Sequence, residues 1–197
     1  TVKKMEIKNE EQKDKIMKEL EGASYVISDV NKKKTKKQPP TPFTTSTLQQ
    51  TANRWLGFNA KQTMTVAQRL YEGVEIKGEG QVGLITYMRT DSLNLSSSFL
   101  EQAKQYLQQQ VGDKYSLSKP KVFKTKSKNA QEAHEAIRPT DITKDPETLR
   151  PSLSSQQYKL YKLIWQRSLA TQMPPAKMDS TTIDVEAETT VAVGTGA

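Results

Sequence analysis

The segment GLITYMRTDSLNLSSSF, residues 83–99, joins an apolar run to a polar turn and then to the start of a helix. Its first part predicts a strand over 82–87, because apolar and β-branched residues dominate there. Its serines predict the N-cap of a helix over 96–112, which ends at a glycine. Extended chain therefore passes directly into a helical region, and a tyrosine stands at the junction.

Tyr87 and Arg89 lie two residues apart, so on extended chain both side chains point to the same face. A tyrosine hydroxyl has an ordinary pKa near 10 and becomes a useful nucleophile when a nearby cation favours the charged form. Thr90, Asp91 and Ser92 predict a turn that supplies backbone N–H groups, and Asp91 could orient Arg89. The alternative is a packing tyrosine at the end of a strand, followed by a surface arginine.

The only histidine of the chain, His134, lies in NAQEAHEAIRPT, residues 129–140. If this segment is helical, His134 shares a face with Ile137 and Arg138, and the two cationic side chains could contact one phosphate. The alternative is a histidine satisfied by Glu135 or by a helix cap. The sequence contains no acidic cluster spaced for Mg²⁺ and no phosphate-binding glycine loop.

The two ends of the chain predict a small sheet. A strand over 1–7, a helix over 9–22 and a strand over 23–30 would form a β-α-β unit, with Asn9 as the helix cap. Residues 180–188 alternate apolar and polar side chains, which predicts a half-buried strand that could return to the same sheet.

Residues 31–43, NKKKTKKQPPTPF, predict an exposed linker, because a lysine run followed by prolines disfavours a buried core. The lysines could also contact phosphates. The lysine-rich segment 114–128 is ambiguous in a similar way. It could be a basic β-ribbon beside a helical core or a solvated loop.

The middle of the chain predicts a helical region. Helices over 44–57, capped by Ser46 or Thr47, and over 59–73 would form a pair of the helix-turn-helix kind. Residues 74–83 predict a surface hairpin. The aromatic residues of 153–172 recur at helical spacing, which predicts a core helix and not a base-stacking platform.

The chain is polar and basic. Hydrophobic residues make up 34% of its 197 residues and the mean hydropathy is −0.75, so we expect modest cores. A net charge of +8 suits nucleic acid first and an anionic membrane second, although it could serve solubility alone. The absence of cysteine excludes disulfides and thiolate metal sites. Without a membrane span or a signal sequence, the cytoplasm is the default expectation.

Four segments carry a resemblance to a known family. Residues 42–73, 83–96, 130–140 and 173–182 resemble, in the same order, motifs of bacterial DNA topoisomerase I, the type IA family. The match to GLITYMRTDSLNLS, the active-site motif of that family, and to AQEAHEAIRPT, its histidine motif, is long and specific.

The resemblance implies roles for individual residues. Tyr87 matches the nucleophile, which attacks a phosphodiester of single-stranded DNA to give a 5′-phosphotyrosyl link. Arg89 matches the arginine that stabilises this phosphate, and His134 matches the histidine that helps to hold it. Arg138 is implied as a neighbouring DNA contact, together with the turn at residues 90–92. Strand passage and religation relax negative supercoils without ATP.

The resemblance also implies a fold of the α+β class. A β-rich arch domain, residues 1–38 and 173–197, would be split by an inserted, mainly helical tyrosine domain, residues 39–172, of winged-helix or catabolite-activator-like form. The Mg²⁺ of the family is bound by a Toprim domain, which this chain lacks. We therefore expect a fragment that works with the remaining domains of a nucleoid-associated cytoplasmic enzyme, without a membrane partner, and that does not cleave DNA alone.

Two other classes remain open. The chain could be a non-catalytic, basic winged-helix-like module in which Tyr87 only packs. It could also belong to a different tyrosine nuclease or recombinase, but such enzymes commonly gather several arginines and histidines around the tyrosine or carry metal-binding histidine pairs. A single histidine argues against this class.

Overall fold

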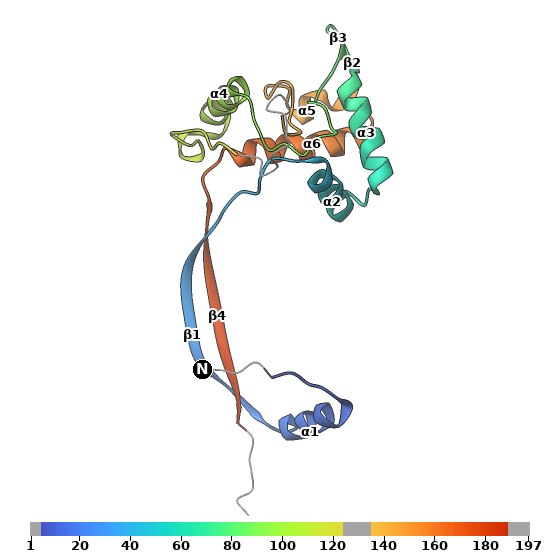
Figure 1. Ribbon diagram of the computed structural model, residues 1–197. Helices are drawn as coiled ribbons and strands as arrows, with labels where there is room; N and C mark the ends of the chain where they lie inside the picture. The colour runs from blue at the N-terminus through green and yellow to red at the C-terminus, as the bar shows by residue number, and fades with distance from the viewer. Residues whose placement is uncertain (1–4, 124–134, 189–197) are drawn as a thin grey trace, which may run out of the picture. The chain divides into compact units, whose positions relative to one another are not determined.

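The computed structural model describes residues 5–123 and 135–188. It divides the chain into two compact units, one formed by Thr1–Lys36 and Lys177–Ala197 and the other by Lys37–Ala176 (Figure 1). Both helices and strands are present, which confirms the mixed class. The identification of these units as an arch domain and an inserted tyrosine domain stays a prediction.

The first unit contains one helix and a two-stranded ribbon. Helix α1 (Glu10–Leu20) is capped by Asn9, whose side chain accepts a hydrogen bond from the Gln12 amide at 2.9 Å. Strand β1 (Ser24–Lys37) pairs with β4 (Ala176–Glu188). Ser24 contacts Glu188 and Thr35 contacts Met178, so the two strands run antiparallel. The predicted return of the last strand to the first sheet is therefore confirmed.

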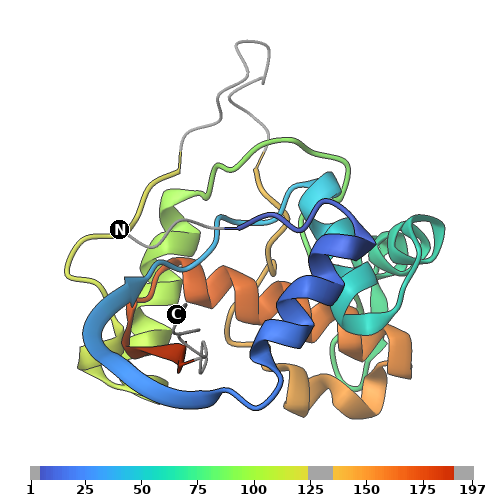
Figure 2. The same cartoon turned by 90° about the horizontal axis from the view of Figure 1, so that it is seen from below.

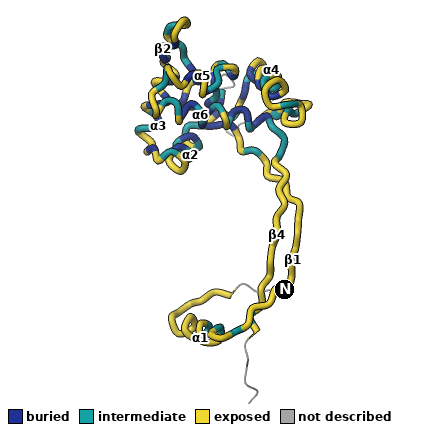
Figure 3. The backbone as a smooth tube through the Cα atoms, turned by 180° about the vertical axis from the view of Figure 1, so that it is seen from behind, coloured by how far each residue is buried: buried dark blue, intermediate teal, exposed yellow. Residues whose placement is uncertain are grey.

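Three expectations for this unit are wrong. Residues 5–7 form no strand, so the described part contains no β-α-β unit, and residues 1–4 lie outside it. Strand β1 continues through the lysine run, where a linker was predicted, because its backbone pairs with β4; the predicted exposure of this run is confirmed, and residues 38–41 have no regular structure. Strand β4 is not half-buried. Ile183 and Val185 are 53% and 55% exposed, because no second layer covers the ribbon among the described residues (Figure 3).

The second unit is built around helix α6 (Ser155–Thr171). Its N-terminal half packs with α2 (Thr45–Leu56) and α3 (Ala60–Glu72) around a core that includes the fully buried side chains of Phe43, Leu48, Leu70, Leu84, Leu160 and Tyr161. Its C-terminal half packs with α4 (Ser97–Tyr106) around Phe99, Leu107, Ile142 and Leu169 (Figure 2). The predicted core helix is confirmed.

Local capping chemistry sets the helix boundaries. Gly57, at φ +71°, ends α2 in the left-handed conformation, and Asn59 caps α3, both as predicted. The cap of α2 is Thr44 and not Ser46 or Thr47. Thr44 is in extended conformation and accepts from the Thr47 amide, while the Thr47 side chain accepts from the Thr44 amide.

Shorter elements connect these helices. Strands β2 (Val74–Ile76) and β3 (Gly80–Val82) form the predicted hairpin. Helix α4, capped by Ser96, continues as a π-helical turn over Leu107–Val111, and a 3₁₀ turn follows at Asp113–Tyr115. Helix α5 (Pro146–Leu149) and the 3₁₀ turn Arg150–Ser152 precede α6.

One predicted strand is largely missing, and the alternative left open for the lysine-rich segment is decided for its described part. The strand expected over 82–87 stops at Val82, and beyond it only Ile85 makes an isolated bridge, to Pro139. Residues 116–123 form a loop and no β-ribbon, and residues 124–128 of the lysine-rich segment lie outside the described residues. Gln172 holds this loop through hydrogen bonds to both backbone groups of Lys121.

Tyr161 makes the stability of the helical unit sensitive to alkaline pH. Its ring is fully buried and its hydroxyl donates to the Lys144 carbonyl at 2.7 Å. Burial, with smaller contributions from Asp141 and Asp145, raises the pKa of Tyr161 well above its ordinary value. Because the pKa of this hydroxyl is higher in the folded than in the unfolded protein, its contribution to the free energy of unfolding is fully present below the unfolded-state pKa. The contribution is lost as the pH rises from that value towards the folded-state pKa.

We therefore expect the free energy of unfolding to fall above about pH 10, by up to about 1.4 kcal/mol per pH unit from this group. Tyr161→Phe removes the titrating hydroxyl and should flatten this fall. Urea unfolding of both proteins between pH 8 and pH 11 measures the two slopes. Parallel loss of stability in the two proteins would contradict the assignment.

Candidate active site

The tyrosine segment approaches helix α3 closely. The Leu84 amide donates to the Leu70 carbonyl at 2.7 Å, and a Cβ atom on Gly83 would lie 2.7 Å from the Tyr71 carbonyl oxygen. A side chain at position 83 would therefore collide with backbone. This contact explains why the chain carries a glycine directly before the apolar run that leads to Tyr87.

Tyr87 and Arg89 are exposed, while their neighbours are buried. Tyr87 is 46% exposed, whereas Met88 and Thr90 are 3% and 8% exposed. The buried side chains anchor the segment and alternate with the two exposed ones, in agreement with the shared face that the spacing predicts. The Tyr87 ring meets the Tyr71 ring edge-on, with centroids 5.3 Å apart. Among the described residues, the Tyr87 hydroxyl has no hydrogen-bond partner, so it is available to a ligand.

Thr45, in the first turn of α2, fixes the backbone on both sides of Arg89. Its hydroxyl donates to the Met88 carbonyl at 2.8 Å and accepts from the Thr90 amide at 2.9 Å. Its own amide donates to the Thr90 carbonyl at 2.9 Å. The sequence indicated only a helix cap in this region, and the role of Thr45 could not be foreseen, because its partners lie more than forty positions along the chain.

An open groove lies where the tyrosine segment meets the start of α2. It has a volume of about 410 Å³ and is lined by Thr44, Thr45, Ser46, Arg89, Thr90 and Asp91. The N-terminus of a helix carries partial positive charge, and an arginine beside it adds a full positive charge. The groove therefore suits a phosphate group beside Arg89, two residues after Tyr87, although Asp91 in its lining is negative.

The turn after Arg89 is held by its own side chains. The Ser92 amide donates to the Thr90 hydroxyl at 3.0 Å, and the Asn94 amide donates to the Ser92 hydroxyl at 3.1 Å. Thr90 and Ser92 are buried, so both hydroxyls serve the turn itself. The expectation that Asp91 orients Arg89 is not met, because no ion pair joins these two described residues.

Residues 135–139 are extended and not helical, which corrects the helical face predicted for this segment. Ile137 bridges to Phe43 and Pro139 bridges to Ile85. These bridges supply backbone partners from distant parts of the chain, and Pro139 cannot donate to a helix. His134 lies outside the described residues, so the predicted grouping of His134 with Arg138 stays a prediction.

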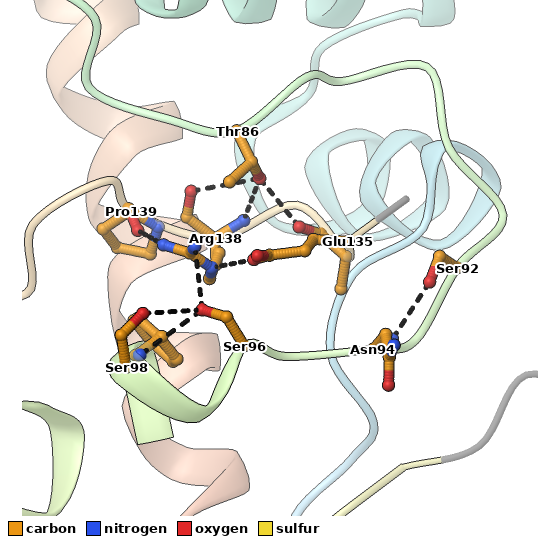
Figure 4. Close-up of polar contacts among 10 residues, drawn as sticks. Thr86, Ser92, Asn94, Ser96, Ser98, Glu135, Arg138 and Pro139 are labelled. Carbon is orange, nitrogen blue, oxygen red and sulfur yellow. Dashed lines mark hydrogen bonds and ion pairs between the residues drawn. The ribbon is translucent and has the colours of Figure 1, made fainter. Parts of the chain in front are cut away.

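The Arg138 side chain is directed into the protein (Figure 4). Its Nε donates to the Glu135 carboxylate, and its two terminal nitrogens donate to the Pro139 carbonyl and to the Ser96 hydroxyl. The guanidinium also lies over the Phe99 ring, 4.8 Å from its centroid. The sequence pointed to Arg138 but not to Glu135 or Ser96 as its partners.

The described residues contain no group of three or more His, Asp or Glu side chains that could hold a metal ion. Within the same ranges, no helix combines the length and the apolar character needed to cross a membrane. Nothing in the described site therefore fits the Mg²⁺ that the resemblance implies.

Comparison with known proteins gives consistent matches. The sequence profile of a DNA topoisomerase family matches residues 1–196. DNA topoisomerase 1 of Rickettsia felis is 47% identical over 178 residues, which cover 90% of this chain and 23% of the relative. DNA topoisomerase 1 of Xylella fastidiosa is 50% identical over 161 residues, which cover 82% of this chain and 20% of the relative.

A solved structure is also similar. Full-length topoisomerase I from Thermotoga maritima superimposes with a TM-score of 0.71 at 35% sequence identity. The match covers 96% of this chain and 31% of that protein. The chain therefore spans about a fifth to a third of the length of the proteins it matches.

Thr45 provides a direct test of the support beneath the site. Thr45→Val keeps the shape but leaves the buried Thr90 amide and the Met88 carbonyl without their partner. We expect a loss of about 1–3 kcal/mol in the free energy of unfolding. Thr65→Val is the matched control, since Thr65 is exposed on α3 and bonds only to its own helix, and it should change stability by less than about 0.5 kcal/mol. Equal losses in urea unfolding would contradict the role given to Thr45.

Proposed function

This chain belongs to the bacterial DNA topoisomerase I family, of type IA, and we propose that it carries the nucleophile of such an enzyme, Tyr87. The observation that supports this most directly is the pairing of an exposed tyrosine with an exposed arginine beside a groove at the start of a helix. The motif resemblance points to the same tyrosine.

The proposed reaction is a reversible transesterification on single-stranded DNA. The Tyr87 oxygen attacks a backbone phosphorus and loses its proton, the bond from phosphorus to the 3′ oxygen breaks, and that oxygen takes up a proton. The product is a 5′-phosphotyrosyl link and a free 3′-hydroxyl. Because the link keeps the energy of the phosphodiester, the 3′-hydroxyl can reverse the step without ATP.

Four parts of the chain would support this step. Arg89 would hold the non-bridging oxygens of the phosphate and stabilise their charge in the transition state. The first turn of α2 would contribute its positive end, and residues 90–92 would keep Arg89 in place. His134 would contact the same phosphate. Arg138 is not assigned a DNA contact here, because its guanidinium is used inside the protein.

The remaining parts of the cycle would need other domains of a longer enzyme. The unit formed by β1, β4 and α1 would be part of an arch that parts to let the second strand through, and the helical unit would be the inserted tyrosine domain. The Mg²⁺ of the family would be bound outside these residues, so no step is assigned to a metal here. Negative supercoiling would drive relaxation.

Trapping of a covalent complex tests the assignment of Tyr87. The full-length protein that contains this chain should form a denaturant-stable adduct with end-labelled single-stranded DNA, and Tyr87→Phe should form none. Tyr115→Phe is the control, because Tyr115 is similarly exposed at 39% but lies beyond α4. An adduct that survives in Tyr87→Phe would show that another residue is the nucleophile, and the absence of an adduct in both proteins would favour a non-catalytic DNA-binding module.

The isolated chain should behave differently. We expect it to bind single-stranded DNA weakly, through phosphate contacts that weaken as salt rises, and not to cleave it. Fluorescence anisotropy at 50 and 200 mM salt measures binding, and gel analysis with Mg²⁺ measures cleavage. Cleavage by this chain alone would show that the metal-dependent chemistry does not need another domain.

A further inference from the structure

We infer that Arg138 is a positioning residue, which holds the chain after His134 against α4 and thereby fixes the backbone that presents Tyr87. This inference rests on the proposed function, since it assigns how the nucleophile is held. It differs from the phosphate contact that the sequence predicts for the same arginine.

The side-chain contacts of Arg138 join two segments, its own and the start of α4. The guanidinium donates to Glu135 and Pro139 on its own segment and to the Ser96 hydroxyl, 42 positions away, at 3.2 Å. Three of its five N–H groups are thus used within the protein. The side chain is 12% exposed and the Glu135 side chain 29% exposed, so the ion pair is largely sheltered from water.

Ser96 gives this contact its anchor. Its hydroxyl also accepts from the Phe99 amide as the N-cap of α4, and the Phe99 ring lies beneath the guanidinium. Phe99 is almost completely buried, so it cannot move away from the arginine without disturbing the core. The planar guanidinium fork of arginine fits this arrangement, because it lies over the Phe99 ring while its N–H groups donate in different directions within its own plane.

The backbone of Arg138 reaches the residue before the nucleophile. The Thr86 amide donates to the Arg138 carbonyl at 2.9 Å, and the Arg138 amide donates to the Thr86 hydroxyl at 3.0 Å. The Thr86 hydroxyl donates in turn to the Ala136 carbonyl at 2.7 Å (Figure 4). Tyr87 therefore directly follows Thr86, the residue that Arg138 and Ala136 hold in place.

The other end of the tyrosine segment is held by the same residues, 136–138. The Ala136 amide donates to the Asn94 carbonyl at 2.8 Å, so residues 136–138 join both Thr86 and Asn94. The segment 87–93 forms a loop between these two attachment points. A guanidinium that locks 135–139 to α4 would thus limit the movement of the whole loop. A small displacement of a reacting group is enough to slow a reaction strongly. Loss of this support should therefore lower the cleavage rate.

Arginine-to-lysine substitution separates the two roles of Arg138. A phosphate contact depends mainly on charge, which lysine keeps, whereas the internal contacts depend on the fork, which lysine lacks. In the full-length protein, we expect both Arg138→Lys and Arg138→Ala to lower the single-turnover rate of DNA cleavage at least tenfold. Arg150→Lys and Arg150→Ala are the matched controls, because Arg150 is 69% exposed, and they should leave the rate unchanged.

Non-covalent binding is measured in the Tyr87→Phe background, where no adduct forms. We expect Arg138→Ala to change the affinity for single-stranded DNA less than twofold and to leave its salt dependence unaltered. A phosphate contact would instead weaken binding and reduce the salt slope by about one charge. That result, or full cleavage activity in Arg138→Lys, would overturn the inference.

A second variant covers the case in which Arg138→Ala does not fold. Ser96→Gly removes the hydroxyl that Arg138 contacts, but glycine is also a good N-cap, so α4 should be kept. Ser96→Gly should also lower the cleavage rate. The double variant with Arg138→Lys should cleave about as slowly as the slower single variant, because both substitutions remove the same contact. Independent, multiplicative effects would contradict a shared contact.

Amide hydrogen exchange separates this inference from the proposed function. Arg138→Lys should speed exchange at the Thr86 and Ala136 amides at least tenfold compared with Arg150→Lys, because both amides bond within the held segments. Unchanged exchange would overturn the positioning role, whatever the cleavage data show. Faster exchange in a protein that forms no Tyr87 adduct would instead retain the positioning role and refute the nucleophile assignment.

Discussion

The candidate site depends on the pairing of residues 83–86 with residues 136–140. Thr86 bonds to the backbone of Ala136 and Arg138, and Thr140 bonds to the carbonyls of Gly83 and Leu84. Neither segment forms a regular strand of its own, so each takes its extended shape from the other. Leu84 and Ile85 on one segment and Ala136 and Ile137 on the other are buried, and this part of the pairing is therefore protected from competition by water.

Exposure of the tyrosine follows from this pairing. Ile85 and Met88 are buried on either side of Tyr87, which is exposed like Arg89, and Arg89 lines the groove where α2 begins. Thr45 then fixes the backbone around Arg89 from the side of the helix, while Thr86 fixes the backbone before Tyr87. The proposed nucleophile Tyr87 and Arg89 thus lie on a short stretch between two anchored points. Such preorganisation suits a reaction in which charge develops on a phosphate.

Much of this fold could be predicted from local sequence patterns. The caps at Asn9 and Asn59, the stop at Gly57 and the core face of α6 depend on residues within a few positions of one another. The errors occur where distant chain decides the outcome. Residues 135–139 look helical by spacing but find backbone partners at Phe43 and Ile85, and the lysine run looks like a linker but pairs with β4.

The candidate site shows the same division. The spacing of Tyr87 and Arg89 was enough to predict that both side chains share one face, because alternation on extended chain is a local property, but it left open whether Tyr87 is exposed or packed. The partners of Arg138 were not predictable in this way, since Ser96 and Phe99 reach it only through the packing of α4. The supporting role of Thr45 escaped prediction for the same reason.

Mass spectrometry of the trapped complex would test the central claim, that Tyr87 is the nucleophile, most directly. The full-length protein would be reacted with a short single-stranded oligonucleotide, denatured, treated with nuclease and digested with trypsin. The tryptic peptide of residues 78–89 contains Tyr87 as its only tyrosine. Our account predicts that this peptide carries the residual nucleotide through a phosphate on Tyr87. A nucleotide attached to any other residue would contradict it.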